Sequence, residues 1–230
     1  MRDKILKAFT KAVSQQKSDP IDYNSSANFD WIATCGLPWL KLDIDIPYKV
    51  ILEEIKQISD YLTSHRTDYN FNVGWSSFCI HGKSYDATRE DAYYNDNRPK
   101  VWTEEAQKCM PLTVDYFKNT WPCDQYARLR VMLLEPGASI EVHRDEISPG
   151  RMRPINIAIT QPEDCNFYVE KHGIIPFEEG SAFWIDIGNR HCVVNDSKQN
   201  RYHIILHQEI ETEEFKNLVT RSYHKIYGNN

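Results

Sequence analysis

The spacing of hydrophobic residues changes near position 71 of this 230-residue chain. In the earlier part, apolar side chains recur every three to four residues, which is the period of an amphipathic helix. Later they fall in short runs rich in β-branched and aromatic residues, and Gly, Pro and Asp separate these runs. Short strands divided by turn residues are typical of a β-sandwich or barrel. The pattern therefore predicts a mainly β fold with flanking α-helices.

The apolar pattern also predicts where the helices lie. Residues 5–13 form a first amphipathic stretch, which a polar linker follows. Pro47 suits the first turn of a second helix, whose apolar stripe is Ile51, Ile55, Ile58 and Leu62. The helical stretch at 102–121 should divide at Pro111, because proline lacks the N–H that continues a helix. A last helix should end near Gly228, with the apolar residues Phe215, Leu218, Val219 and Ile226.

Length and composition predict one domain. With 41% hydrophobic residues, the chain can bury a single sizeable core. We expect an N-terminal helix and linker at 1–37, the β domain with supporting helices at 38–208, and a C-terminal helix at 209–230.

Charge and cysteine content bear on partners and compartment. The net charge is −6 and the pI is near 5.8, so the surface repels phosphate backbones and we expect no nucleic-acid partner. No apolar run approaches the roughly 18 to 20 residues of a membrane-spanning helix, and the charged start does not fit a secretory signal. We therefore expect no membrane partner and a cytoplasmic protein. The six cysteines lack zinc-site spacing and fit reduced packing residues.

Candidate chemistry begins at "EVHRDEI", where His143 and Asp145 stand two residues apart after an apolar run. In an extended strand such residues share a face, although His-x-Asp also arises by chance. His191 follows a Gly-Asn turn at the start of a later strand. Two imidazoles and one carboxylate leave metal positions open, which suits non-haem Fe(II) chemistry. A structural zinc site would instead close four ligands, usually with cysteine.

A candidate anion contact follows ten residues after His191. Arg201 opens the strand "RYHIILHQ", and its guanidinium fork matches a carboxylate. The alternative is an ordinary surface arginine at a strand start. His203 and His207 share the face of Arg201 by alternation, so one of them can line the barrel interior. A buried, hydrogen-bonded structural role is the other interpretation for each histidine.

These motifs, in this order, resemble a known family. The segments "RLRVMLLEPGASIEVHRD", "GSAFWIDI", "HCVVN" and "RYH", with the "GW" and "HG" of "VGWSSFCIHG", resemble the aspartyl/asparaginyl β-hydroxylases. That family consists of Fe(II)/2-oxoglutarate-dependent oxygenases, and the resemblance covers about residues 38–208. Vertebrate-type members lack the carboxylate ligand. Asp145 therefore moves the likeness toward the bacterial branch, which hydroxylates free amino acids such as proline.

The resemblance implies a double-stranded β-helix, the jelly roll also found in cupins. It implies that His143, Asp145 and His191 bind iron and that Arg201 binds the distal carboxylate of 2-oxoglutarate, with O2 as the other cosubstrate. It also implies hydroxylation in preference to halogenation, because halogenating relatives replace the carboxylate ligand.

Three further cosubstrate contacts are less direct. Asn195 falls where the family keeps an Asn, and a turn residue closing the strand is an equal alternative. Where an Arg-x-His is expected before "I-P-L", this chain has "RMRPINIAI", with Asn156 in place of the His. Arg153 and Asn156 are therefore the candidates for the proximal carboxylate of 2-oxoglutarate.

Arginine is dense around the metal motif. A cationic wall suits two anionic small molecules, a 2-oxo acid and a carboxylate-bearing amino acid or peptidyl substrate. The alternative is surface pairing with neighbouring glutamates; we favour a functional role for Arg130 and Arg153 and a surface position for Arg128, Arg144 and Arg151. In "IHGKS", His81 and Ser84 are candidates for contacting the substrate, although a polar loop pair explains them nearly as well.

The function expected from these residues is that of an Fe(II)/2-oxoglutarate-dependent dioxygenase. It would hydroxylate an amino acid or an amino-acid side chain and release succinate and CO2. One alternative is a cupin-like metal dioxygenase that does not use 2-oxoglutarate, and another is a non-enzymatic, metal-binding jelly-roll module. Arg201 separates the first alternative from the main hypothesis, because that chemistry needs no anchor for a carboxylate.

Overall fold

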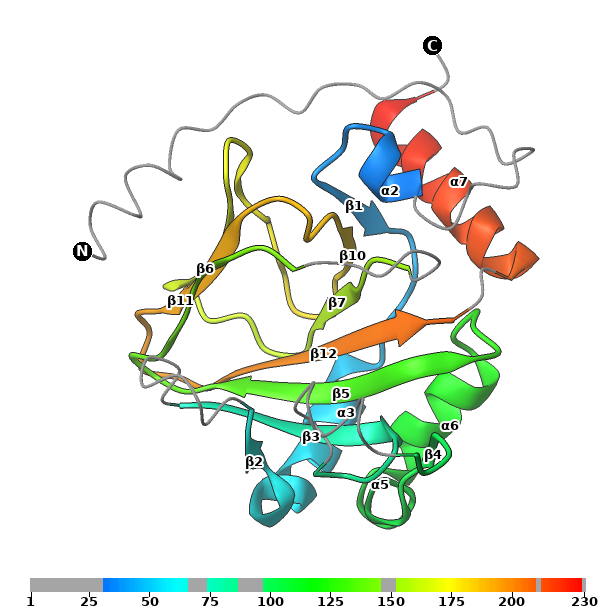
Figure 1. Cartoon of the computed structure of the whole chain (residues 1–230), viewed down its shortest axis with the longest axis vertical. Coiled ribbons are helices and arrows are strands. Elements are labelled where there is room, and N and C mark those ends of the chain that lie inside the picture. The colour runs from blue at the N-terminus through cyan, green and yellow to red at the C-terminus, as the bar shows by residue number, and fades with distance from the viewer. Residues whose placement is uncertain (1–30, 66–73, 87–96, 146–151, 210–211, 229–230) are drawn as a thin grey trace.

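The computed structural model describes residues 31–65, 74–86, 97–145, 152–209 and 212–228 (Figure 1). Two β-sheets face each other in this part of the chain. The strands of the large sheet are β1 (Trp39–Leu42), β2 (Thr63–Ser64), β3 (Trp75–Gly82), β4 (Val101–Trp102), β5 (Tyr126–Leu134), β7 (Ile155–Ala158), β10 (Ala182–Ile185) and β12 (Arg201–Gln208). Those of the small sheet are β6 (Ser139–His143), β8 (Cys165–Val169), β9 (Gly173–Ile174) and β11 (His191–Asn195).

The strand order is that of a jelly roll. The large sheet runs β1-β10-β7-β12-β5-β3-β2, with β4 beside β3, and the small sheet runs β6-β11-β8-β9. From β5 to β8 and again from β10 to β12, successive strands alternate between the two sheets, and the pairings are antiparallel. This alternation winds the chain into a double-stranded β-helix. The expected fold class is thus confirmed.

Helices cover the outer face of the large sheet. The described helices are α2 (Trp31–Thr34), α3 (Tyr48–Ile55) with its 3₁₀ continuation η2 (Lys56–Tyr61), α5 (Glu104–Cys109), α6 (Pro111–Asn119) and α7 (Glu213–Tyr227). Pro47 precedes α3, and Pro111 divides α5 from α6, as predicted. The first predicted helix, at 5–13, lies outside the described residues. None of the helices in the described ranges is long and apolar enough to cross a membrane.

The last helix ends before Gly228, as predicted. Of its four apolar marker residues, Phe215, Leu218 and Val219 are buried and Ile226 is 47% exposed. The buried stripe of α7 ends at Tyr223, and Ile226 follows in the last turn before Gly228.

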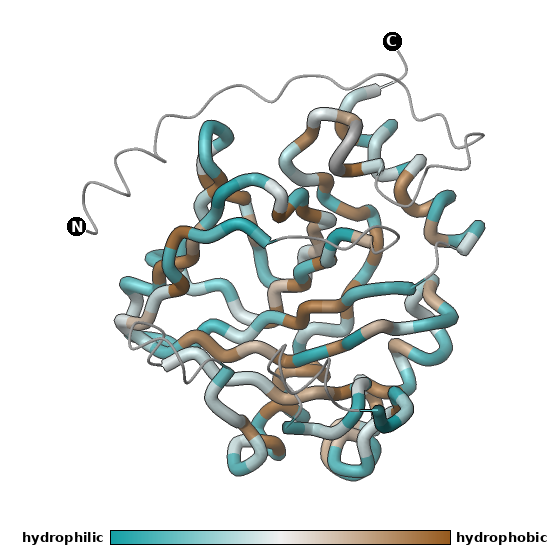
Figure 2. The backbone as a smooth tube through the Cα atoms, viewed as in Figure 1, coloured by the Kyte–Doolittle hydropathy of each residue, from teal (hydrophilic) through white to brown (hydrophobic). Residues whose placement is uncertain are grey.

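The core has two compartments because the large sheet is covered on both faces. Leu129 and Val131 of β5 pack toward the helices, whereas Met132 and Leu134 pack toward the small sheet. Apolar residues accordingly mark strands through the middle of the molecule, and the peripheral loops are mostly hydrophilic (Figure 2). Every residue of β5 is buried, so the predicted surface position of Arg128 is wrong.

Candidate active site

A β-bulge brings two histidines to the inner face of the small sheet. His191 of β11 lies opposite His143 of β6, but Val193 lies opposite Ile140, so β6 has one extra residue between these pairs. Ile140 packs between the sheets. Val142 packs on the outer face of the small sheet, against Tyr168, Cys192 and Val194. The extra residue breaks the alternation of β6 and turns His143 inward, as bulges near active sites commonly do. The two imidazole centroids are 4.3 Å apart.

The carboxylate of Asp145 completes a three-residue cluster. One possible ligand atom from each of His143, Asp145 and His191 lies within 4.8 Å of the others. Asp145 Oδ1 is 3.7 Å from His143 Nε2, and Asp145 Oδ2 is 3.9 Å from His191 Nε2. The Asp145 backbone N–H donates to Ile187 O at 3.2 Å, which holds this residue beside the end of β10.

Hydrogen bonds set both imidazoles in the tautomer that a metal requires. His143 Nδ1 lies 2.7 Å from Glu141 O, and His191 Nδ1 lies 2.9 Å from Asn189 O. Because a carbonyl oxygen only accepts, each Nδ1 carries the hydrogen. Each Nε2 then keeps its lone pair and faces the cluster, the arrangement found in ligating histidines.

Burial favours the neutral form of His191. Burial lowers the pKa of this imidazole, the adjacent His143 lowers it further, and Asp145 opposes the shift. A neutral ring is the form that binds a metal ion. Phe167 stacks on the His191 ring, with the two ring centroids 5.4 Å apart. In contrast, the side chains of His143 and Asp145 are 28% and 36% exposed. The cluster is thus closed on the side of His191 and open on the side of the other two residues.

The turn between β10 and β11 supports two of the three candidate ligands. Asp186 Oδ1 accepts from the backbone N–H of Gly188 at 3.0 Å, and its Oδ2 accepts from the Asn189 amide at 3.0 Å. The carbonyls of Ile187 and Asn189 in the same turn hold Asp145 and His191. Sequence reasoning did not single out Asp186, although it lies five residues before His191 in "FWIDIGNRH".

Arg153 belongs to this supporting turn. Its Nε donates to Asp186 Oδ1 at 3.0 Å, and both side chains are largely buried. The structure therefore brings Arg153 to the metal-ligand candidates through Asp186. A direct contact of Arg153 with the cosubstrate stays a prediction.

Arg201 begins β12 in the large sheet and faces the small sheet across the interior. Its strand does not pair with the strand that carries His191, because β11 and β12 belong to different sheets. Ring contacts join the two positions. Phe167 stacks on the ring of His191. The ring centroids of Phe167 and Phe177 are 6.2 Å apart, and those of Phe177 and His203 are 4.7 Å apart.

The guanidinium of Arg201 is a buried cation. The residue is 3% exposed, and its Nη2 donates to His203 Nδ1 at 2.7 Å. Within the described ranges no carboxylate pairs with it; the nearby Cys165 thiol is its remaining electrostatic neighbour. Burial lowers the pKa of Arg201 to about 10, so the charge persists at neutral pH. A buried charge without a counterion is costly and indicates a site for an anion.

Arg130 and Asn156 lie on the same interior face. Ile205 of β12 separates them in the sheet register, with Arg130 on β5 and Asn156 on β7. They are 5% and 3% exposed. Asn156 Oδ1 accepts no hydrogen bond from the described residues. Both predicted residues are therefore interior polar groups on the sheet that carries Arg201.

Asn195 acts as a turn residue. Its amide nitrogen donates to the carbonyls of Leu134, Glu135 and Gln199, and its oxygen accepts from the Ser197 backbone N–H and hydroxyl. These contacts occupy the Asn195 amide within the chain, as the alternative of a turn residue that closes the strand requires.

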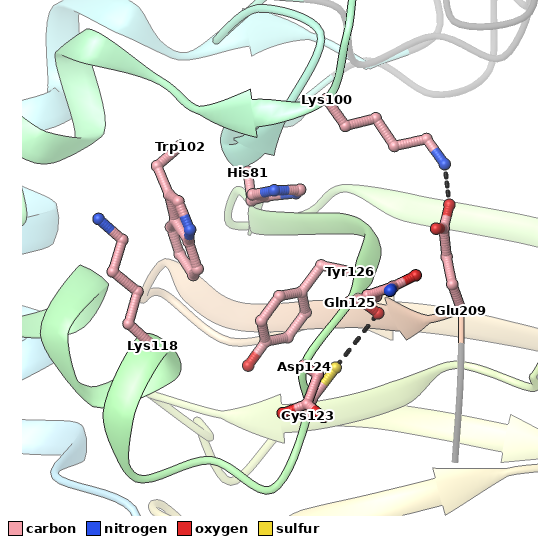
Figure 3. A pocket seen from close by; sticks show the side chains of 9 residues that line it. All are labelled: His81, Lys100, Trp102, Lys118, Cys123, Asp124, Gln125, Tyr126 and Glu209. Carbon is pink, nitrogen blue, oxygen red and sulfur yellow. Dashed lines mark hydrogen bonds and ion pairs between the residues drawn. The ribbon is translucent and has the colours of Figure 1, made fainter. Parts of the chain in front are cut away.

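His81 and Ser84 are not brought to the metal-ligand cluster. His81 lines a separate cavity of about 440 Å³ together with Trp102 and Tyr126 (Figure 3). Neither the metal-ligand cluster nor Arg201 lines this cavity. Burial and the nearby Lys100 lower the pKa of His81 to about 4. The Ser84 hydroxyl donates to Asp86 Oδ1 at 2.6 Å on the surface. A substrate contact by either residue has no support from these positions.

Replacing Asp186 by alanine should lower the affinity for Fe(II). The turn would lose its internal acceptor, so the carbonyls that orient Asp145 and His191 would no longer be fixed. Loss of such a supporting carboxylate typically costs about 10- to 100-fold in metal affinity. Anaerobic Fe(II) titration measures the effect. Glu170→Ala, which breaks a surface ion pair with Arg190, is the matched control. Equal affinities in the two variants would remove Asp186 from this role.

Comparison with known proteins gives a family match and distant structural likenesses. The sequence model of the Aspartyl/Asparaginyl beta-hydroxylase family matches residues 45–209. The curated proteins give no match.

Two solved structures illustrate the structural likeness. A Pseudomonas putida prolyl-4-hydroxylase is 13% identical, with a TM-score of 0.46, over 78% of this chain and 96% of that one. A Trichoplax adhaerens prolyl hydroxylase, in complex with a hypoxia inducible factor peptide fragment, is 14% identical, with a TM-score of 0.49, over 81% and 89%. Likenesses this distant carry no information about the substrate.

The family match includes all three metal-ligand candidates and Arg201 and spans more than half of the sequence. The chain therefore belongs to the aspartyl/asparaginyl β-hydroxylase family and is a hydroxylase that depends on Fe(II), 2-oxoglutarate and O2.

Proposed function

We propose that this enzyme hydroxylates a carboxylate-bearing amino acid, either free or within a peptide. His143, Asp145 and His191 are the proposed ligands of Fe(II). Arg201 is the proposed contact of the distal carboxylate of 2-oxoglutarate. The observation that carries the proposal is the buried guanidinium of Arg201, which has no counterion in the described chain and shares an interior with the three converging ligand atoms.

The donor set fits Fe(II). Two neutral imidazoles and one carboxylate form the facial arrangement of non-haem iron oxygenases, which leaves positions open for small molecules. Cysteine is absent from the cluster, which argues against a closed structural zinc site. When bound, Fe(II) and 2-oxoglutarate supply the oxidising chemistry, in which O2 is consumed and succinate and CO2 are released.

The chain positions the proposed ligands and keeps the guanidinium of Arg201 away from water. Arg201 stays protonated in the interior, where a low dielectric strengthens its attraction for a carboxylate. Asp186 and the carbonyls of its turn hold two ligands in place. The exposed side of His143 and Asp145 is the side from which a substrate can approach. Orientation of this kind lowers the entropic part of the barrier.

A carboxylate on the substrate is the finer part of the proposal. Arg130 and Arg128 are both buried on β5, in an enzyme whose net charge is −6. A buried guanidinium fork in the same interior as Arg201 suits a second carboxylate. Asn156, one strand beyond Ile205, is the proposed neighbour of the proximal end of 2-oxoglutarate.

A cytoplasmic location is also proposed. All six cysteines are free thiols, and four of them are buried. This distribution fits a reducing compartment, in which Fe(II) also persists.

Replacing His191 by alanine should abolish turnover and leave the fold intact, because the change removes an imidazole ligand from an open site. Succinate formation with saturating Fe(II) measures turnover, and circular dichroism measures folding. His224→Ala, on the exposed face of α7, is the control. Near-normal 2-oxoglutarate consumption by folded His191→Ala would show that this residue is not a ligand.

Replacing Arg201 by alanine should raise the KM for 2-oxoglutarate, because its distal carboxylate loses a buried partner. The expected loss is about 2 to 5 kcal/mol. Lysine should restore only part of it, since an ammonium lacks the planar fork. An unchanged KM in Arg201→Ala would instead favour a metal dioxygenase that does not use 2-oxoglutarate.

Replacing Arg130 by leucine should uncouple the reaction. If Arg130 fixes the substrate carboxylate, its loss leaves the reacting C–H bond poorly placed, so less product forms per 2-oxoglutarate consumed. The ratio of hydroxylated product to succinate measures coupling across a set of amino acids and short peptides. Arg221→Leu, on the surface of α7, is the control. Wild-type coupling in Arg130→Leu would refute the carboxylate contact.

A further inference from the structure

Among the described residues, the side-chain hydrogen bond of Arg201 leads into a short chain of polar groups. His203, two residues along β12, is fully buried. Its Nδ1 lies 2.7 Å from Arg201 Nη2, and its Nε2 lies 3.0 Å from Gln161 Oε1. Gln161 lies between β7 and β8, and its Nε2 donates to Cys165 O at the start of β8. The chain therefore ties the guanidinium to the small sheet.

Each hydrogen bond in this chain has one allowed direction. Cys165 O only accepts, so the amide nitrogen of Gln161 faces it and the amide oxygen faces His203. An amide oxygen also only accepts, so His203 carries its hydrogen on Nε2. Its Nδ1 is then left with a lone pair. That lone pair meets Arg201, whose guanidinium only donates.

The acceptor that meets Arg201 is uncharged. Burial and the neighbouring guanidinium hold the pKa of His203 well below its usual value. A carboxylate at this position would orient Arg201 equally well, but it would also neutralise the guanidinium and compete with an incoming anion. A neutral imidazole satisfies one N–H and leaves the full positive charge for a ligand.

We propose that His203 and Gln161 are positioning residues, which orient Arg201 toward the distal carboxylate of 2-oxoglutarate. This inference rests on the proposed role of Arg201. The alternative is that His203 only fills space in the core, where it lies edge-on to Phe177. A space-filling residue would affect all ligands of the site equally. A residue that orients Arg201 affects only ligands that carry a distal carboxylate.

The test compares two 2-oxo acids on the full-length, Fe(II)-loaded enzyme without O2. 2-Oxoglutarate has the distal carboxylate and pyruvate lacks it, so the ratio of their dissociation constants isolates the Arg201 contact. Gln161→Leu removes the partner of Nε2 and lets the imidazole hydrogen move to Nδ1, where it opposes Arg201. We expect its 2-oxoglutarate affinity to fall about tenfold or more, the cost of losing a hydrogen bond to a charged group, with pyruvate affinity unchanged.

Two further variants define the role of the acceptor. His203→Leu removes the acceptor and should weaken 2-oxoglutarate binding at least as much as Gln161→Leu. His203→Asn places an amide oxygen at the δ position that Nδ1 occupies, so it should restore much of the affinity. Ile204→Val is the control, because Ile204 is equally buried but packs on the opposite face of β12.

The outcomes separate this inference from the proposed function. If Arg201→Ala weakens 2-oxoglutarate binding but Gln161→Leu does not, only the positioning role is wrong. If Gln161→Leu weakens the binding of 2-oxoglutarate and the binding of pyruvate equally, His203 and Gln161 serve only to pack the core. If Arg201→Ala itself leaves 2-oxoglutarate binding unchanged, both the role of Arg201 and the inference fail. Further support would come from Gln161→Leu having no added effect in the Arg201→Ala background, since coupled residues are not additive.

Discussion

The bulge in β6 is the constraint on which the metal-ligand cluster depends. A regular strand with Ile140 facing the core would direct Val142 inward and His143 outward. The extra residue reverses this order, so that His143 meets His191 on the inner face. Backbone pairing of β6 with β11 holds the reversal in place, and the hydrogen bond from His143 Nδ1 to Glu141 O uses a carbonyl of the bulged strand. One irregularity in a ladder thus sets both the position and the tautomer of a candidate ligand.

The parts of the site that the sequence predicted are those encoded by short spacing. His143 and Asp145 lie two residues apart, and His191 and Arg201 each stand at the start of a strand. The supporting contacts join residues far apart in the chain. Arg153 meets Asp186 across 33 positions, and His203 meets Gln161 across 42. No local pattern encodes these pairs, because each joins positions on or beside strands that are distant in the chain but are neighbours in the large sheet.

Burial was the other property that local pattern could not supply. Arg128 carries a charge and stands near glutamates in the sequence, which favoured a surface position. β5 is central in the large sheet, with β12 on one side, β3 on the other, helices on one face and the small sheet on the second. Every side chain on such a strand is enclosed, whatever its chemistry. Strand order is a tertiary property, so the composition of "ARLRVMLL" alone could not reveal it.

The same enclosure explains why a neutral histidine is the suitable neighbour for Arg201. A buried guanidinium has five N–H donors to satisfy, and each donor left unpaired in a low dielectric is costly. Pairing the guanidinium with a carboxylate of the chain would relieve this cost permanently, but it would also occupy the proposed anion site. Pairing one nitrogen with His203 relieves part of the cost, and the remaining donors and the charge are left for a ligand. The interior therefore balances stability against the proposed binding of an anion at a single side chain, and the acceptor-only carbonyl of Cys165 fixes the direction of the hydrogen bonds that join it to Arg201.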